Sequence, residues 1–173
     1  MRVLLQSGAD IQAADFTGRT QLHIAARQGR YEAMALLLEK GADENAEDHL
    51  RRSPLHDAVA GKNARAVRVL LLANADINQG NEIGSAPLHF AVKDLEVMKE
   101  LCNWNADLDR LDMMGRTPLH IAVAESCSEV AACLLREGTD PYRFGLSPSR
   151  PSTTRSNRTT ERWWVSSSGT ASM

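Results

Sequence analysis

Thr117-Pro118-Leu119-His120 is the last of four related tetrapeptides that decide the fold of this chain. The earlier copies read T-Q-L-H from Thr20, S-P-L-H from Ser53 and A-P-L-H from Ala86, so successive copies begin 33, 33 and 31 residues apart. A second motif, G-A-D or a close variant, keeps nearly the same interval, with copies that begin at Gly8, Gly41, Asn74, Asn105 and Gly138. A period of this length is typical of a solenoid, in which one supersecondary unit stacks on copies of itself.

The unit at residues 15–47 carries the signals of two short helices. A turn at its start ends in Gly18, and Thr20 follows where an N-cap residue is expected to accept a hydrogen bond from a free helical N–H. A second helix is predicted from Tyr31 to Lys40, where Gly41 ends it in the left-handed conformation. Helices of about ten residues are not stable alone in water. Stability is therefore expected to come from the interfaces between successive units.

The tetrapeptides and their period resemble the ankyrin-repeat family over residues 1–144. The resemblance implies an all-α solenoid of helix–turn–helix units joined by β-turn fingers. The expected domains are a partial repeat at 1–14, repeats at 15–47, 48–80, 81–111 (two residues short) and 112–144, and a disordered Ser/Thr/Arg-rich tail at 145–173. Because the partial repeat at 1–14 has no first helix, we expect either a fragment of a longer protein or a frayed N-terminal edge, and favour the fragment.

Four histidines recur with the repeat, at His23, His56, His89 and His120. Stacked helices lie about 10 Å apart, whereas zinc ligands lie about 2 Å from the metal, so the four cannot share one ion. The resemblance implies instead that each imidazole hydrogen-bonds the cap residue and neighbouring backbone. Three cysteines, Cys102, Cys127 and Cys133, have no metal-binding spacing and are expected to be small core residues.

The second and third repeats depart from the pattern. Asp57 occupies a position that is Ile24, Phe90 or Ile121 in the other units. In the third repeat Ala86 cannot cap a helix, and Glu100 stands where the earlier units have Leu36 and Val69. We expect local opening to begin in this third repeat.

Composition and the absence of known motifs argue against several classes of function, namely nucleic-acid binding, membrane association and catalysis. Residues 1–140 carry 21 acidic and 15 basic side chains, which argues against a nucleic-acid partner. No apolar run is long enough to span a bilayer and no signal peptide is evident, so no membrane association is expected. The chain is predicted to be monomeric and cytoplasmic, with the nucleus as an alternative. No catalytic or phosphate-binding motif is found, so neither an enzyme nor a cofactor is expected.

The tail contains one apolar cluster, Trp163-Trp164-Val165. It has three interpretations: a cap over the last repeat, a short linear motif, or no role at all.

The resemblance implies that partners bind at the turn tips and the inner face of the first helices. Every tip offers an apolar side chain, and arginines follow the turns in three of the four repeats. The candidate partner-binding residues are Phe16, Arg19, Leu50, Arg52, Ile83, Met113, Met114 and Arg116. An apolar row beside arginines suits a segment with hydrophobic and acidic residues.

The sequence therefore predicts a protein-interaction module that acts as an adaptor, scaffold or inhibitor. The alternative is a fragment of a larger ankyrin-containing protein whose effector domain, an enzyme, a channel or a ubiquitin-ligase adaptor, lies outside this sequence.

Overall fold

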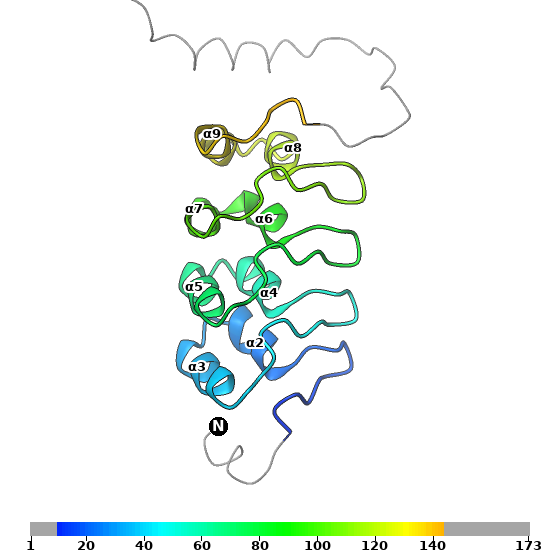
Figure 1. Cartoon of the computed structure of the whole chain (residues 1–173), viewed down its shortest axis with the longest axis vertical. Helices are drawn as coiled ribbons and strands as arrows, with labels where there is room; N and C mark the ends of the chain where they lie inside the picture. Colours follow the sequence, from blue (N-terminus) through cyan, green and yellow to red (C-terminus); the bar gives the residue numbers. More distant parts are fainter. Residues whose placement is uncertain (1–9, 144–173) are drawn as a thin grey trace, which may run out of the picture.

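The computed structural model describes residues 10–143, which form four stacked helix pairs (Figure 1). The pairs are α2 (Gln21–Arg27) with α3 (Tyr31–Glu39), α4 (Pro54–Ala60) with α5 (Ala64–Leu72), α6 (Pro87–Phe90) with α7 (Leu95–Asn103), and α8 (Pro118–Ala124) with α9 (Ser128–Arg136). A 3₁₀ turn, η1 (Ala91–Lys93), follows α6. The predicted all-α solenoid is confirmed. The tail with Trp163-Trp164-Val165 and most of the partial repeat at 1–14 lie outside the described residues.

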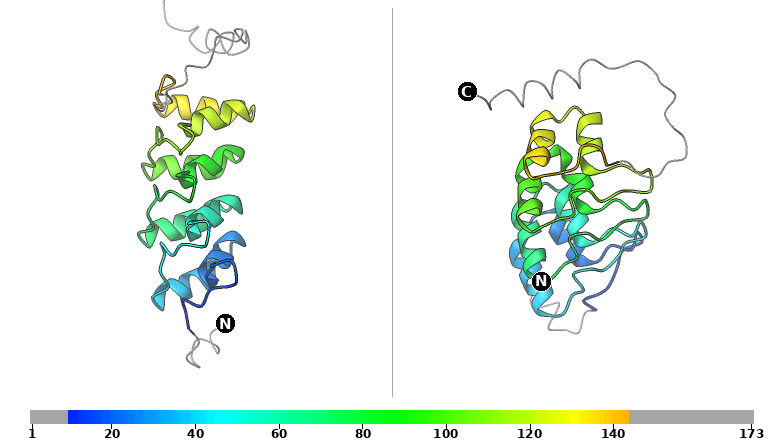
Figure 2. Two further views of the ribbon diagram at one scale, coloured as in Figure 1. Left: turned by 90° about the vertical axis from the view of Figure 1, so that its right-hand side faces the viewer. Right: turned by 45° about the horizontal axis from the view of Figure 1, so that its top comes forward.

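The helices form two layers. The first helices, α2, α4, α6 and α8, lie in one layer, the second helices, α3, α5, α7 and α9, lie in the other, and the connecting hairpins project beyond the first layer (Figures 1 and 2). Small residues let the layers approach closely, since Ala25, Ala26, Ala58, Ala91 and Ala122 are all buried. The apolar core runs without interruption through all four helix pairs.

The four projecting hairpins, called the fingers below, are residues 15–19, 48–52, 81–85 and 112–116. Each begins with Asp or Asn, whose Oδ1 accepts hydrogen bonds from the backbone two and four residues later. The fourth residue of each finger has a positive φ, which glycine adopts freely. Arg51 takes this conformation in the second finger, with φ 57°, and its side chain pairs with Glu47 at 3.1 Å.

Backbone hydrogen bonds join the fingers to one another. His49 N donates to Thr17 O at 3.0 Å, Glu82 N to Leu50 O at 2.9 Å, and Met113 N to Ile83 O at 3.0 Å. A parallel set lies in the loops after the second helices, where Asn45, Asn78 and Asp109 each accept a hydrogen bond from the backbone of the next repeat. The fingers are therefore held in register by main-chain contacts as well as by helix packing.

All four recurring histidines accept a hydrogen bond from the backbone N–H of the residue before the helix, as the resemblance implied, and three of them, His23, His56 and His89, also contact the backbone of the next repeat. In His56, Nδ1 accepts a hydrogen bond from Ser53 N at 3.1 Å, and Nε2 lies 3.1 Å from Ser85 O of the next repeat. His23 and His89 make the equivalent contacts. The Thr20 hydroxyl lies at the start of α2, and its hydrogen bond is with His23 Nδ1 at 2.9 Å. An Nδ1 acceptor and an Nε2 donor correspond to the neutral imidazole.

This arrangement predicts that acid weakens the fold below neutral pH. Burial lowers the pKa of His56 and of His89 below the usual range, so the unfolded chain binds protons more readily. Their contribution is complete above pH ~6.5 and is lost as the pH falls below that value, at up to about 1.4 kcal/mol per pH unit for each histidine. Urea unfolding at pH 7.5 and pH 5.5 measures the loss. A His49→Gln variant, changed at an exposed histidine, should keep this dependence, whereas equal stability of the wild type at both pH values would contradict the prediction.

The third repeat replaces the missing residues by local adjustments. The first helix shortens to α6 and continues as η1, and Asp94 then caps α7 by accepting a hydrogen bond from Val97 N at 3.1 Å. Glu100 is buried, but both of its oxygens bind Arg68 of α5, at 2.8 and 2.7 Å, and Trp104 Nε1 donates to it at 3.0 Å. The hydrogen bonds from Arg68 lower the pKa of Glu100 although burial opposes this. Glu100 is thus a cross-repeat contact rather than an unpartnered substitution.

Candidate partner-binding face

The fingers carry the predicted apolar side chains to the edge of the molecule. Phe16 is 93% exposed, and Leu50, Ile83, Met113 and Met114 are exposed as well. The inter-finger hydrogen bonds place Leu50, Ile83 and Met114 in one row, at the position that Thr17 occupies in the first finger. Phe16 and Met113 lie one residue earlier in their fingers, in a second row that also contains His49 and Glu82. The structure therefore brings the apolar residues to one edge, in two rows rather than one.

The finger arginines are already paired. Arg19 binds Asp15 at 3.3 Å, Arg52 binds Asp48 at 2.7 Å and Arg116 binds Asp112 at 2.8 Å, each within its own finger. Burial opposes ionisation of Asp48, but hydrogen bonds from Arg52 outweigh it and hold the pKa below its usual range. The hydrogen bond from the Thr17 hydroxyl is the main cause that lowers the pKa of Asp15 to about 2. The fingers thus present ion pairs rather than a row of free cations.

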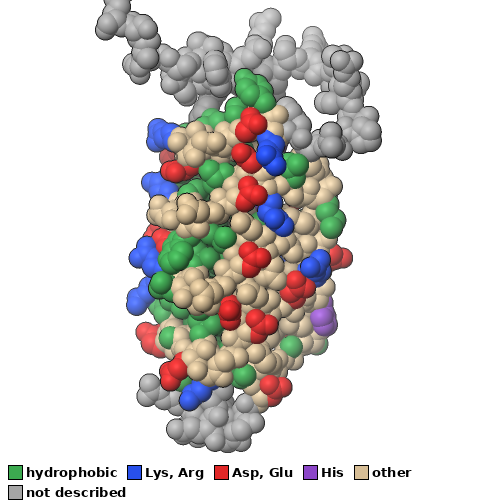
Figure 3. Space-filling view, in the orientation of Figure 1, with side chains coloured by type: hydrophobic (Ala, Val, Ile, Leu, Met, Phe, Trp, Pro, Cys, Tyr) green, Lys and Arg blue, Asp and Glu red, His purple; other side chains and the backbone are tan. Residues whose placement is uncertain are grey.

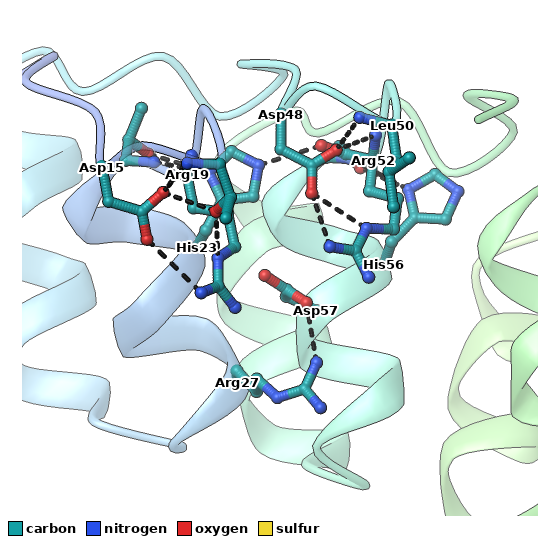
Figure 4. A network of polar contacts seen from close by, with 12 residues as sticks. Asp15, Arg19, His23, Arg27, Asp48, Leu50, Arg52, His56 and Asp57 are labelled. Carbon is teal, nitrogen blue, oxygen red and sulfur yellow. Dashed lines mark hydrogen bonds and ion pairs between the residues drawn. The ribbon is translucent and has the colours of Figure 1, made fainter. Parts of the chain in front are cut away.

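Behind the fingers, the first helices carry a second set of polar contacts (Figure 4). Asp57 in α4 is buried, with only 1% of its side chain exposed, and its Oδ1 accepts a hydrogen bond from Arg27 Nη1 of the preceding repeat at 3.1 Å. Its Oδ2 is also buried and has no hydrogen-bond partner. The sequence marked Asp57 as unusual but did not indicate its pairing, because Arg27 lies 30 residues earlier.

Further along this layer the surface becomes more apolar. Phe90 is exposed on one side and packs edge-on against His56, with the ring centroids 5.7 Å apart. Val123 of α8 is also exposed, and Lys93 pairs with Glu125 of the next repeat at 2.9 Å. The fingers and the first helices together form the face that is called the finger–helix face below.

A column of carboxylates follows the loops after the second helices (Figure 3). Its exposed members are Asp10, Asp43, Asp76, Asp107 and Asp140. Each Oδ1 accepts a hydrogen bond from the backbone two residues later, so these carboxylates shape the loops. Within residues 10–143 no group of three or more His, Cys, Asp or Glu side chains is arranged to hold a metal ion.

The cysteines occupy packed or half-buried positions. Burial is the largest cause that raises the pKa of the Cys102 thiol to about 11, so this thiol stays protonated at neutral pH. Cys133 is buried and Cys127 is half-buried at the start of α9. In the part of the chain that is described, no helix is long and apolar enough to cross a bilayer.

Comparison with known proteins agrees with the repeat architecture. A model of ankyrin repeats, described as three copies, matches residues 1–48 and 55–144. No curated protein matches the chain significantly. Ankyrin repeats are in general protein-interaction modules. The matched residues make up most of the sequence and cover all eight described α-helices apart from Pro54 at the start of α4; the chain belongs to the ankyrin-repeat family.

Proposed function

We propose that this chain binds a segment of another protein across the finger–helix face, and thereby acts as an adaptor, scaffold or inhibitor. The observation that carries the proposal is the gathering of exposed apolar side chains on this face. Ten large hydrophobic residues are exposed between residues 10 and 143, and seven of them lie on the fingers or on the first helices. An exposed apolar patch of this kind marks an interaction site, and methionine adapts well to a partner's shape.

The pairing of the finger arginines affects which residues a bound segment is expected to use for binding. Because Arg19, Arg52 and Arg116 each have a carboxylate partner, acidic residues of a bound segment would compete with Asp15, Asp48 and Asp112. Hydrophobic anchors on the tips are therefore the main source of affinity, with acidic contacts as an addition at the rim. The three cysteines have no disulfide partner among the described residues, which suits a reducing compartment, the cytoplasm or the nucleus.

The test is a triple variant, Phe16→Ser, Leu50→Ser and Met114→Ser. These side chains are exposed, so the variant should remain helical by circular dichroism and, like the wild type, should elute as a monomer. Proteins captured from a cell lysate by the wild type should bind the variant at least about tenfold less tightly, since apolar anchors dominate such interfaces.

A matched control replaces Leu72 and Tyr142 by serine. Both side chains are exposed but lie away from the finger–helix face, on α5 and in the loop after α9. The control should bind as the wild type does. Unchanged binding by the triple variant, or an equal loss in the control, would contradict the proposed site.

A further inference from the structure

Asp57 is a buried carboxylate in a row of apolar residues. The equivalent positions of the other repeats hold Ile24, Phe90 and Ile121, none of which needs a hydrogen bond. Only 1% of the Asp57 side chain is exposed, and its Oδ2 has no partner. A buried polar atom without a partner destabilises the folded state, because the hydrogen bonds that it made with water are not replaced. The stack would hold together better with an apolar residue here, so the carboxylate needs another explanation.

The nearby finger arginines, Arg19 and Arg52, do not donate a hydrogen bond to Asp57 Oδ2. Arg52 directs Nε and Nη2 to Asp48 Oδ2, at 2.9 and 2.7 Å. Arg19 directs Nε to the Thr17 hydroxyl and Nη2 to Asp15. Both arginines therefore hydrogen-bond residues of their own fingers, as Figure 4 shows. Their guanidinium groups nevertheless lie on the same face as Asp57. The atom that lacks a partner is an acceptor, so the missing group is a hydrogen-bond donor.

Arg27 is a replaceable partner for Asp57. It makes one contact, from Nη1 at 3.1 Å, and 48% of its side chain is exposed. A guanidinium binds a carboxylate most strongly through two parallel hydrogen bonds, and here only one forms. Movement of Arg27 into solvent would leave both oxygens of Asp57 without a donor, as a pair that matches the two parallel hydrogen bonds of a guanidinium.

We propose that Asp57 is the polar anchor of the finger–helix face and accepts both hydrogen bonds of an arginine side chain from the bound segment, which displaces Arg27. This inference rests on the proposed function, because the same segment places its apolar residues on the finger tips. Charge favours such a ligand, since residues 10–143 carry 21 acidic and 15 basic side chains. Phe90, which contacts His56 beside Asp57, offers an aromatic surface for the stem of the arginine.

The experiment selects peptides from a random phage-displayed library on the full chain. Selected sequences should combine an arginine with apolar residues. A synthetic peptide made from them should bind Asp57→Asn about tenfold or more weakly than the wild type, because a charge pair is lost. The same peptide with its arginine changed to glutamine should show an equal loss on the wild type and little further loss on Asp57→Asn. The original peptide, with its arginine, should bind the Arg27→Ala variant more tightly than the wild type, because Arg27 no longer competes for Asp57.

The outcomes separate this inference from the proposed function. Peptides that lack arginine, or that bind Asp57→Asn as tightly as the wild type, overturn the role of Asp57. If those peptides still fail to bind the Phe16, Leu50 and Met114 triple variant, the proposed function stands. Equal binding to the triple variant overturns the proposed function instead. A library that yields no binder to the wild type overturns both.

Discussion

Replacing Arg68 by alanine is expected to lower the free energy of unfolding clearly, and by more than the loss of an exposed arginine that has no carboxylate partner. The change removes both hydrogen bonds from Arg68 to Glu100, a carboxylate whose side chain is 8% exposed. Breaking a fully buried pair costs about 3–5 kcal/mol because it leaves an unpaired charge. We expect less here, because 60% of the Arg68 side chain is exposed and water can replace part of the contact. Urea unfolding followed by circular dichroism measures the difference.

Two further variants identify the cause. Arg65→Ala removes another arginine of α5, which lies 4.5 Å from the centre of the Tyr31 ring, and should cost only about 0.5–1 kcal/mol. Adding Glu100→Val to Arg68→Ala supplies the residue found at the equivalent position, Val69, and should restore most of the lost stability, since no buried charge remains. If Arg68→Ala costs no more than Arg65→Ala, the pair with Glu100 does not support the stack.

Gly61→Ala is expected to destabilise the chain by about 3 kcal/mol, through overpacking where the first two repeats meet. A Cβ at Gly61 would lie 2.1 Å from the carbonyl oxygen of Arg27, and backbone cannot move aside as a side chain can. Relief of the clash requires α2 and α4 to separate, although their contact links the first two repeats. The change in free energy of unfolding, again in urea, is the measurement.

Gly41→Ala provides the contrast. Gly41 has a φ of 85°, but a Cβ there would meet no atom within 4 Å. Its cost is therefore the conformational strain of a left-handed residue, about 1–2 kcal/mol. An equal or smaller effect at Gly61 would show that the first two repeats can separate without cost, against the close approach seen at this glycine.

The fold could be predicted from the sequence because each repeat carries the same local signals. Gly41 and Asn74 end their helices with φ of 85° and 67°, as their place after the second helices predicts. The shortened third repeat was harder to predict. Its missing residues are evident in the sequence, but the 3₁₀ turn and the Asp94 cap that compensate for them depend on where the chain must resume packing.

The candidate face was predictable in its apolar part and not in its polar part. Tip residues such as Phe16 and Met114 follow from their place in the turn. The pairing of Arg19 with Asp15 had a sequence signal, since the same four-residue spacing recurs in the second and fourth fingers. The sequence gives no signal for the contacts between Arg27 and Asp57 and between Arg68 and Glu100. Each contact joins residues about one repeat apart, and whether such residues face each other depends on how the helices stack.

The hydrogen bonds between the fingers fix the spacing of the finger tips. Main-chain atoms form these bonds, so the distance from one tip to the next does not depend on which side chains the tips carry. Mutation can then change the side chain at one tip while the neighbouring tips keep their positions. A bound segment is therefore contacted at evenly spaced positions along its length. A segment with suitable anchors in the wrong spacing would engage one finger and miss the next.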